Sequence, residues 1–306
     1  MSRCGRRGLF RKFLITAVVA VIVAAAAVFV LTAPESVPAS ALPSRAPDLA
    51  NGRVMFLAGG CSSCHMTPQQ KDASRLGGGL QLHTAFGEFF APNISPAAKD
   101  GIGEWSEADF VTAMTRGTAP DGSHLYPAFP YPSYARMRVE DVRDLFAYLK
   151  TLPPVEGRAR PHALRFPFNI RRAVGLWKLL FFDDRPLAPD PSQSAEWNRG
   201  AYLVNGPGHC AECHSPRNLL GAIVARRRFD GGPSPTDQGG VPSIRQDKLG
   251  DWTVDDFVAT LTTGDTPDSD RVGGPMVDVV RNIAQLSDAD RHAMAVYIKS
   301  LPPPKR

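Results

Sequence analysis

Two short runs of the sequence combine a pair of cysteines with a histidine that follows directly. They are 61–65, with the sequence CSSCH, and 210–214, with the sequence CAECH. Two thiols about one helical turn apart can each add to a vinyl group of one haem, and the adjoining histidine can reach the iron. A zinc site would need four ligands, which neither run supplies at a suitable spacing, and a redox dithiol would not need the histidine. The spacing therefore predicts two covalently attached c-type haems, one held by Cys61, Cys64 and His65 and the other by Cys210, Cys213 and His214.

The sequence offers a methionine at the expected sixth-ligand position in only one of the two halves. A haem that only carries electrons usually has methionine in that position, because the soft thioether favours reduced iron. In the second half Met276 follows a Gly-Gly-Pro turn, whereas the matching position in the first half holds Phe129, which cannot bind iron. Three possibilities stay open for the first iron: Met137 as the ligand, His124 as the ligand, or no sixth protein ligand. The expected metal ligands are thus His65, His214, Met276 and Met137.

The two halves of the chain repeat each other, which places the two motifs in equivalent surroundings. Cys61 and Cys210 are 149 residues apart. In each half we expect a short helix that ends at the motif, over 51–60 and 197–208, and then a long loop rich in Gly and Pro. A second helix and a last helix, stopped by prolines, should follow. The second helices begin at matching capping signals, Ser106-x-x-Asp109 and Thr253-x-x-Asp256.

The N-terminal segment is apolar and long enough to cross a membrane. Only Thr16 is polar among the 19 residues from Phe13 to Leu31, and such a helix is about 28 Å long, near the thickness of a bilayer core. The basic residues before it place the N-terminus in the cytoplasm and everything after Thr32 outside. A cleaved signal peptide is the alternative, although its apolar core is usually about 7–15 residues long. The five basic residues that precede the apolar segment account for the net charge of +5. We therefore expect no nucleic-acid surface on the rest of the chain.

The remaining sequence divides by composition and by the repeat. A Pro-rich stretch before the first half is typical of an extended tether. The segment between the halves matches nothing in the repeat and contains an apolar cluster, WKLLFF at 177–182. We interpret it as a linker packed against both halves, with a docking surface for a partner or a membrane as the alternative. The expected parts are a basic tail and transmembrane anchor at 1–32, the tether at 33–48, a first domain at 49–154, the linker at 155–194 and a second domain at 195–306.

Several longer stretches carry a resemblance to a known family. They include LYPAFPY at 125–131, PNISP at 92–96 and TAFG at 84–87, within a similarity that covers nearly everything from Asn51 to Pro303. The chain resembles membrane-anchored di-haem cytochromes c and is similar to the cytochrome c subunits of bacterial alcohol, sugar and aldehyde dehydrogenases. The resemblance implies a mostly α fold, with a transmembrane helix followed by two tandem class I cytochrome c domains that have long Gly/Pro-rich loops. Many of those subunits carry three haems, whereas this chain has two signatures, so the resemblance does not specify a particular donor.

These observations favour an electron carrier without catalytic residues of its own. A haem performs its redox chemistry itself, and the protein positions it and tunes its potential. We expect a periplasmic relay, anchored in the bacterial inner membrane, that takes electrons from a dehydrogenase subunit and passes them to a terminal oxidase or a soluble cytochrome. The alternative is a di-haem enzyme of the peroxidase kind that uses an open first haem. A gas-binding sensor is less favoured, since the sequence shows no output element.

Overall fold

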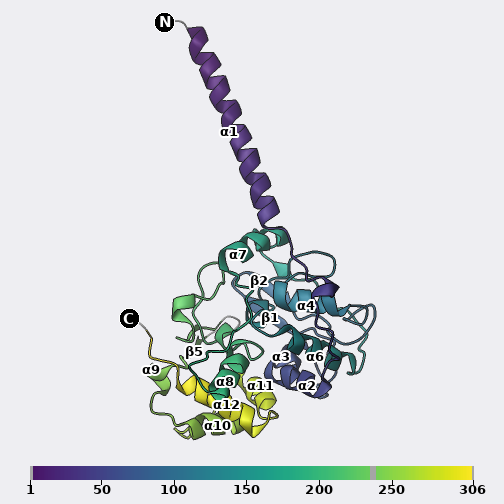
Figure 1. The fold of residues 1–306 in the computed structure, drawn as a ribbon, viewed down its shortest axis with the longest axis vertical. Coiled ribbons are helices and arrows are strands. Elements are labelled where there is room, and N and C mark those ends of the chain that lie inside the picture. The colour runs from purple at the N-terminus through teal and green to yellow at the C-terminus, as the bar shows by residue number, and fades with distance from the viewer. Residues whose placement is uncertain (1–2, 235–238, 305–306) are drawn as a thin grey trace.

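The computed structural model describes residues 3–234 and 239–304, with side chains from residue 9 onward. A single long helix, α1 (Arg3–Leu31), projects from the folded body (Figure 1). Its stretch Leu9–Leu31 has a mean hydropathy of 3.0, and none of it is buried against the rest of the chain. This helix is long and apolar enough to cross a membrane, and a signal sequence near an N-terminus has the same properties.

The first half is built around two helices that cross closely, α2 (Leu49–Ala58) and α6 (Val139–Lys150). Asp48 caps the first of them by accepting hydrogen bonds from the backbone N–H groups of Ala50 and Asn51. At Gly52 a Cβ atom would overlap the carbonyl oxygen of Asp144 on the other helix, so only glycine permits this approach. The elements of this half are α2 (Leu49–Ala58), α3 (Cys61–His65), β1 (Gln81–Thr84), β2 (Gly87–Phe90), α4 (Glu107–Arg116), α5 (Tyr131–Tyr134) and α6 (Val139–Lys150).

The second half repeats this arrangement, as the sequence repeat predicts. Its first and last helices also cross at a glycine, because a Cβ atom at Gly200 would overlap the carbonyl oxygen of Ala293. The second motif differs from the first in forming a 3-10 turn instead of an α-helix. The elements are α8 (Ala195–Asn205), η3 (Cys210–Glu212), η4 (Ala225–Arg227), β4 (Gly232–Pro233), β5 (Gly240–Val241), α9 (Gln246–Leu249), α10 (Val254–Thr263), α11 (Met276–Ile283) and α12 (Asp288–Lys299).

The capping signals read from the sequence form complete capping boxes. The Ser106 side chain accepts from the Asp109 backbone N–H, and the Asp109 carboxylate accepts from the backbone N–H of Ser106. Thr253 and Asp256 do the same at the start of α10. The second helix of each half therefore begins where the sequence predicts.

The segments that flank the first half pack against it. In the Pro-rich stretch, the Val37 backbone N–H donates to Thr112 Oγ1 at 2.9 Å and Arg45 pairs with Asp144 at 2.7 Å, so this stretch is extended but is not a free spacer. The linker adds β3 (Ala163–Leu164) to an antiparallel sheet of order β1-β2-β3. It continues through η2 (Arg171–Ala173) and α7 (Val174–Phe181) to the second half, where Trp177 Nε1 donates to the Leu220 carbonyl at 2.9 Å.

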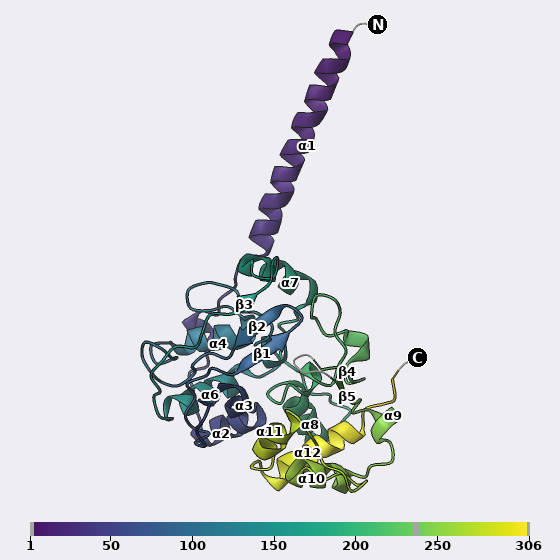
Figure 2. The same ribbon diagram turned by 180° about the vertical axis from the view of Figure 1, so that it is seen from behind.

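The two halves lie side by side on the far side of α7 from α1 (Figure 2). One buried hydrophobic cluster includes residues from both, so their cores are continuous. The helices α2 and α11 meet at the contact between the halves, and α3, which carries the first motif, packs against α2 (Figure 2). The most deeply buried side chains of this cluster include Met55, Leu76, Met137, Leu203, Ile283 and Met294.

Candidate functional site

The first motif is held so that one nitrogen of its histidine stays available. Gly60 takes a left-handed conformation (φ +54°) directly before α3, which turns the chain into the motif. His65 Nδ1 lies 2.8 Å from the carbonyl oxygen of Pro92. Burial lowers the pKa of His65, so the imidazole is neutral and donates its Nδ1–H to this carbonyl. The Nε2 lone pair is then oriented for a metal, which is the usual arrangement of a metal-binding histidine.

The second motif has the same support although its local conformation differs. His214 Nδ1 lies 2.8 Å from the carbonyl oxygen of Pro242, and burial lowers its pKa as well. The residue before the motif, His209, is left-handed like its counterpart (φ +39°). Burial also raises the pKa of Cys61 and of Cys210 to about 12.

A common backbone frame positions both histidines. The Gly78 N–H donates to the carbonyl of His65 at 2.8 Å, and the Gly231 N–H donates to the carbonyl of His214 at 2.9 Å. The loop from His65 to Gly78 and the loop from His214 to Gly231 differ in length, yet each ends in the same backbone hydrogen bond to the histidine. Sequence reasoning did not find these partners, because a backbone carbonyl or amide leaves no signal in residue types.

Side-chain hydrogen bonds join each motif to a helix of the other half. Asn282 of α11, which is buried, accepts from Ser62 Oγ at 3.1 Å and donates to Ser63 Oγ at 3.0 Å. In the reciprocal contact, Ser133 Oγ of α5 donates to Glu212 Oε1 at 2.6 Å. Each half thus supplies one polar side chain that binds the Cys-x-x-Cys segment of the other half. Ser133 and Asn282 are 149 residues apart, the same offset that relates the first cysteines of the motifs.

Further contacts fill the space between the motifs. His209 Nε2 lies 3.1 Å from the carbonyl oxygen of Gly59, across the contact between the halves. The ring of Tyr134 packs edge-on against the His209 ring, with centroids 5.7 Å apart. Burial raises the pKa of Tyr134 well above its ordinary value, and the nearby Cys61, Cys64 and Glu212 add to the shift. The residues that flank the two motifs therefore pack against one another, while Cys64 and Cys213 are exposed.

Arg228 provides a test of whether a haem fits beside the second motif. Burial lowers the pKa of Arg228 to about 10. Its Nε donates to Asn205 Oδ1 at 3.1 Å, but its buried Nη2 has no hydrogen-bond partner among the described residues. A buried guanidinium with a donor to spare suits an anionic group, and a haem propionate is such a group. Nothing in the run Arg226–Arg228 distinguishes this residue by sequence alone.

The candidate sixth ligands have different surroundings. Met276 is the first residue of α11 and is only partly buried. Met137 is 1% exposed in the shared core, and its Cγ lies 3.4 Å from the position that a Cβ on Gly206 would take. Phe129 packs against the Tyr134 ring at 5.5 Å. His124 points elsewhere, since its Nε2 lies 3.0 Å from the carbonyl oxygen of Thr32 at the end of α1.

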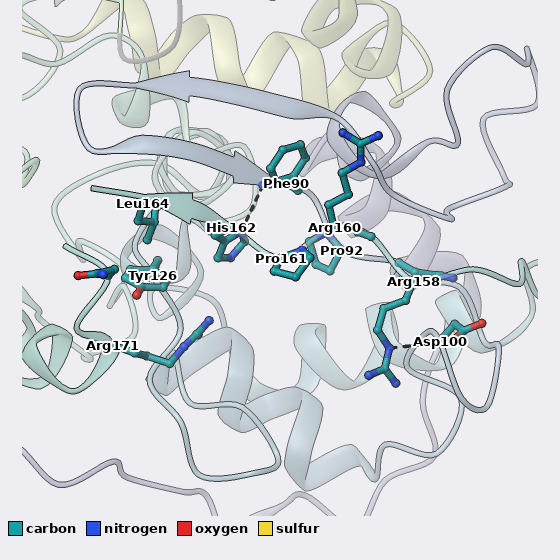
Figure 3. Close-up of a pocket in the computed structure, with 13 residues that line it drawn as sticks. Phe90, Pro92, Asp100, Tyr126, Arg158, Arg160, Pro161, His162, Leu164 and Arg171 are labelled. Atoms are coloured by element: carbon teal, nitrogen blue, oxygen red, sulfur yellow. Dashed lines mark hydrogen bonds and ion pairs between the residues drawn. The ribbon is translucent and has the colours of Figure 1, made fainter. Parts of the chain in front are cut away.

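A cavity of about 350 Å³ lies between β2 and the linker, next to the backbone that supports His65 (Figure 3). Pro92, whose carbonyl accepts from His65, is in its wall, and Arg158 approaches Asp100 at 3.9 Å. The cavity is lined by the linker and the β2 region, and neither motif belongs to its described lining. We assign the chemistry to the motifs.

Comparison with known proteins identifies the kind of protein that has this arrangement. A family model described as "Cytochrome c" matches residues 49–153. The chain is 45% identical over 299 residues to a protein of Cereibacter sphaeroides named "Diheme cytochrome c-type", covering 95% of this chain and 99% of that protein. It is 34% identical to the "Fructose dehydrogenase cytochrome subunit" of Gluconobacter japonicus, over 88% of this chain and 55% of that protein.

A third relative is the "Alcohol dehydrogenase (quinone), cytochrome c subunit" of Gluconacetobacter polyoxogenes, 37% identical over 82% of this chain and 55% of that subunit. The chain thus spans nearly the whole Cereibacter protein but about half the length of the two dehydrogenase subunits.

Proposed function

This chain belongs to the di-haem cytochromes c that are related to the cytochrome c subunits of quinone-dependent alcohol and sugar dehydrogenases, and from that premise we propose that it relays electrons from a periplasmic dehydrogenase to the respiratory chain. Haem supplies the one-electron redox chemistry of such a protein when it is bound. The protein itself holds the groups, sets their separation and docks the partners.

Two sites would hold the haems. Cys61 and Cys64 supply thiols in the first half, and His65 offers Nε2 because its Nδ1–H is engaged by Pro92. The second site consists of Cys210, Cys213 and His214, with His214 fixed in the same way by the carbonyl of Pro242. Arg228 beside Cys210 can neutralise a propionate.

For the sixth positions we propose Met276 in the second half and Met137 in the first. Met276 combines partial burial with a place at the start of α11, next to the motif contact. Met137 is the methionine closest in sequence to the non-binding Phe129, and its burial also gives it a packing role. His124 is a weaker candidate, because it contacts the end of α1.

The single observation that carries the relay is the reciprocal contact between the halves at the motifs, in which each half binds the Cys-x-x-Cys segment of the other. Electron tunnelling slows steeply as the distance between two redox groups grows, so a relay needs them close and rigidly placed. The hydrogen bonds from Asn282 to the first motif and from Ser133 to the second fix that separation from both sides. The hydrophobic cluster that runs through both halves packs against Cys61 and Cys210, one cysteine of each motif.

The parts of the chain take their roles from this arrangement. Residues 1–32 would anchor the protein in the bacterial inner membrane, and 33–48 would follow the surface of the first cytochrome c domain at 49–154. The linker at 155–194 would join it to the second cytochrome c domain at 195–306, with both domains of class I. A dehydrogenase subunit in the periplasm would be the donor, and a terminal oxidase or soluble cytochrome the acceptor. Holding the relay at the membrane would raise its local concentration beside these partners.

A haem count and an electron-transfer assay on the full chain test this proposal. Replacing both cysteines of either motif by alanine should leave one haem per chain, against two in the parent protein. The reduced parent protein should pass electrons to mitochondrial cytochrome c, used as a soluble acceptor probe. Rapid peroxide turnover without electron transfer to that probe would overturn the relay in favour of a peroxidase-like enzyme.

A further inference from the structure

The helix α7 exposes apolar side chains on one face. Leu176, Leu179 and Leu180 are 45%, 53% and 60% exposed, and their spacing places them on a single side of the helix. The other side is the one that packs on the body: Val174 is buried, and Lys178 Nζ donates to the carbonyls of Arg116 and Gly117 at 2.6 and 2.7 Å. This is the reverse of the usual surface helix, which buries its apolar stripe and presents its polar side to water.

Neighbouring segments extend this surface. Phe166, before α7 in the linker, is 78% exposed, and Leu219 and Leu220, in the loop after the second motif, are 96% and 48% exposed. The hydrogen bond from Trp177 Nε1 to the Leu220 carbonyl ties that loop to α7. We call Phe166, Leu176, Leu179, Leu180, Leu219 and Leu220 the α7 patch.

The start of α7 is fastened to the end of α1. Arg172 Nη2 donates to the carbonyl of Phe29 at 2.6 Å, and the Arg172 guanidinium lies 4.7 Å from the centroid of the Phe29 ring. A Cβ atom on Gly175 would come within 2.5 Å of the carbonyl oxygen of Thr32. Figures 1 and 2 both show α7 at the base of α1, where the long helix leaves the body. A bilayer that covers α1 as far as Leu31 must therefore meet α7.

The charges around the patch suit the same surface. The segment 165–185 contains five basic and two acidic residues. Lys178 faces the body, and the other four basic residues, Arg165, Arg171, Arg172 and Arg185, still outnumber the two acidic ones. Asp183 and Asp184 are paired with Arg185 and Arg116, each at 2.8 Å. Apolar side chains flanked by cations are typical of helices that lie in the interface of a membrane with anionic lipids.

From these contacts we infer that the α7 patch is a second membrane-binding surface, which lies in the lipid interface and fixes the orientation of both domains relative to the bilayer. The inference rests on the proposed membrane location, because α1 is what brings the bilayer to α7. An apolar area of this kind is rare on a soluble monomer, and a bilayer spanned by α1 would lie directly beside it. The first half then faces the membrane, and the second half extends away from it (Figure 1).

Spin labels on the full-length, haem-loaded protein in lipid nanodiscs test the inference. Leu180→Cys and Leu219→Cys report on the patch, and Val21→Cys reports on α1, all in a Cys4→Ser background. Leu49→Cys at the start of α2 is the matched control, since Leu49 is 49% exposed and lies on the far side of the body from α1. Each label is compared for its collision rate with oxygen, which enters lipid, and with a nickel chelate, which stays in water.

We expect the ratio of oxygen to nickel collisions at positions 180 and 219 to exceed the ratio at position 49 several-fold, with a larger excess in discs that contain phosphatidylglycerol. Ratios equal to that of the control, with the Val21→Cys label in lipid, would overturn the inference and leave the membrane location intact. Dipolar broadening between labels at position 180 would assign the patch to a second copy of the chain instead. A Val21→Cys label in water would overturn the membrane location and this inference together, while the haem count would still test the relay.

Discussion

Removing the hydroxyl of Ser133 should weaken the contact that joins the first half to the second motif. Ser133 is 1% exposed, and its Oγ donates to Glu212 Oε1 at 2.6 Å. A hydrogen bond to a charged acceptor contributes about 1.5–3 kcal/mol, and its loss leaves that oxygen without its partner in a mostly buried place. Arg217 still holds the other carboxylate oxygen at 2.6 Å, so Glu212 stays in position. We expect Ser133→Ala to lower the free energy of unfolding by about 2 kcal/mol.

Urea unfolding of the haem-loaded full chain in detergent measures this effect. With a denaturant slope of about 3 kcal/mol per M, the loss corresponds to a midpoint lowered by about 0.7 M. Ser74→Ala is a matched control, because Ser74 Oγ also donates to a carboxylate at 2.6 Å, that of Asp72, but at the exposed surface. The control should change stability by less than about 0.5 kcal/mol. If Ser133→Ala and Ser74→Ala shift the midpoint equally, the Ser133 contact does not hold the halves together.

Three further predictions concern the ligands, the buried histidine and the helix starts. Met276→Leu and Met137→Leu should each remove one strongly upfield methyl signal from the NMR spectrum of the reduced protein, because leucine keeps the side-chain volume but cannot bind iron. A spectrum unchanged by Met137→Leu would leave that residue a packing role only. Burial, together with the nearby Lys178 and Arg172, lowers the pKa of His124 to about 4. Between its ordinary pKa of about 6.5 and this value only the unfolded chain binds the proton, so stability is full above pH 6.5 and falls by up to about 3 kcal/mol as the pH approaches 4. Unfolding curves of His124→Gln should show a smaller fall over that range, and an equal fall would mean that other groups cause it. Ser106→Ala should cost about 1 kcal/mol in urea unfolding through the lost capping box, and no change would show that the box adds nothing to α4.

The expectations that rest on local capping signals and on the internal repeat agree with the structure. The capping boxes at Ser106 and Thr253 form as predicted, because each needs only residues three positions apart. The repeat predicts two halves with matching helices, since the offset of 149 residues carries the same apolar and turn positions twice. The long apolar helix follows from composition alone, although its role as an anchor stays a prediction.

Other features depend on contacts that sequence does not record. The Pro-rich stretch at 33–48 has the composition of a free tether, yet Val37 and Arg45 attach it to the first half. The second motif has the spacing of the first but forms a 3-10 turn. His124 was an alternative iron ligand by residue type, and the fold directs it to the carbonyl of Thr32 instead.

The sequence by itself predicted the cofactor chemistry, because two thiols and a histidine within five residues are the signature of a haem-attachment segment wherever the rest of the chain lies. It also predicted that this chemistry occurs twice. Only the tertiary structure decided that each half binds the predicted segment of the other, through Asn282 of α11 and Ser133 of α5. These bonds join residues 220 and 79 positions apart, and a hydroxyl or an amide gives no sign in sequence of the distant partner it will meet. In the proposed relay, docking of the halves and not the motifs alone brings the two predicted haem sites together.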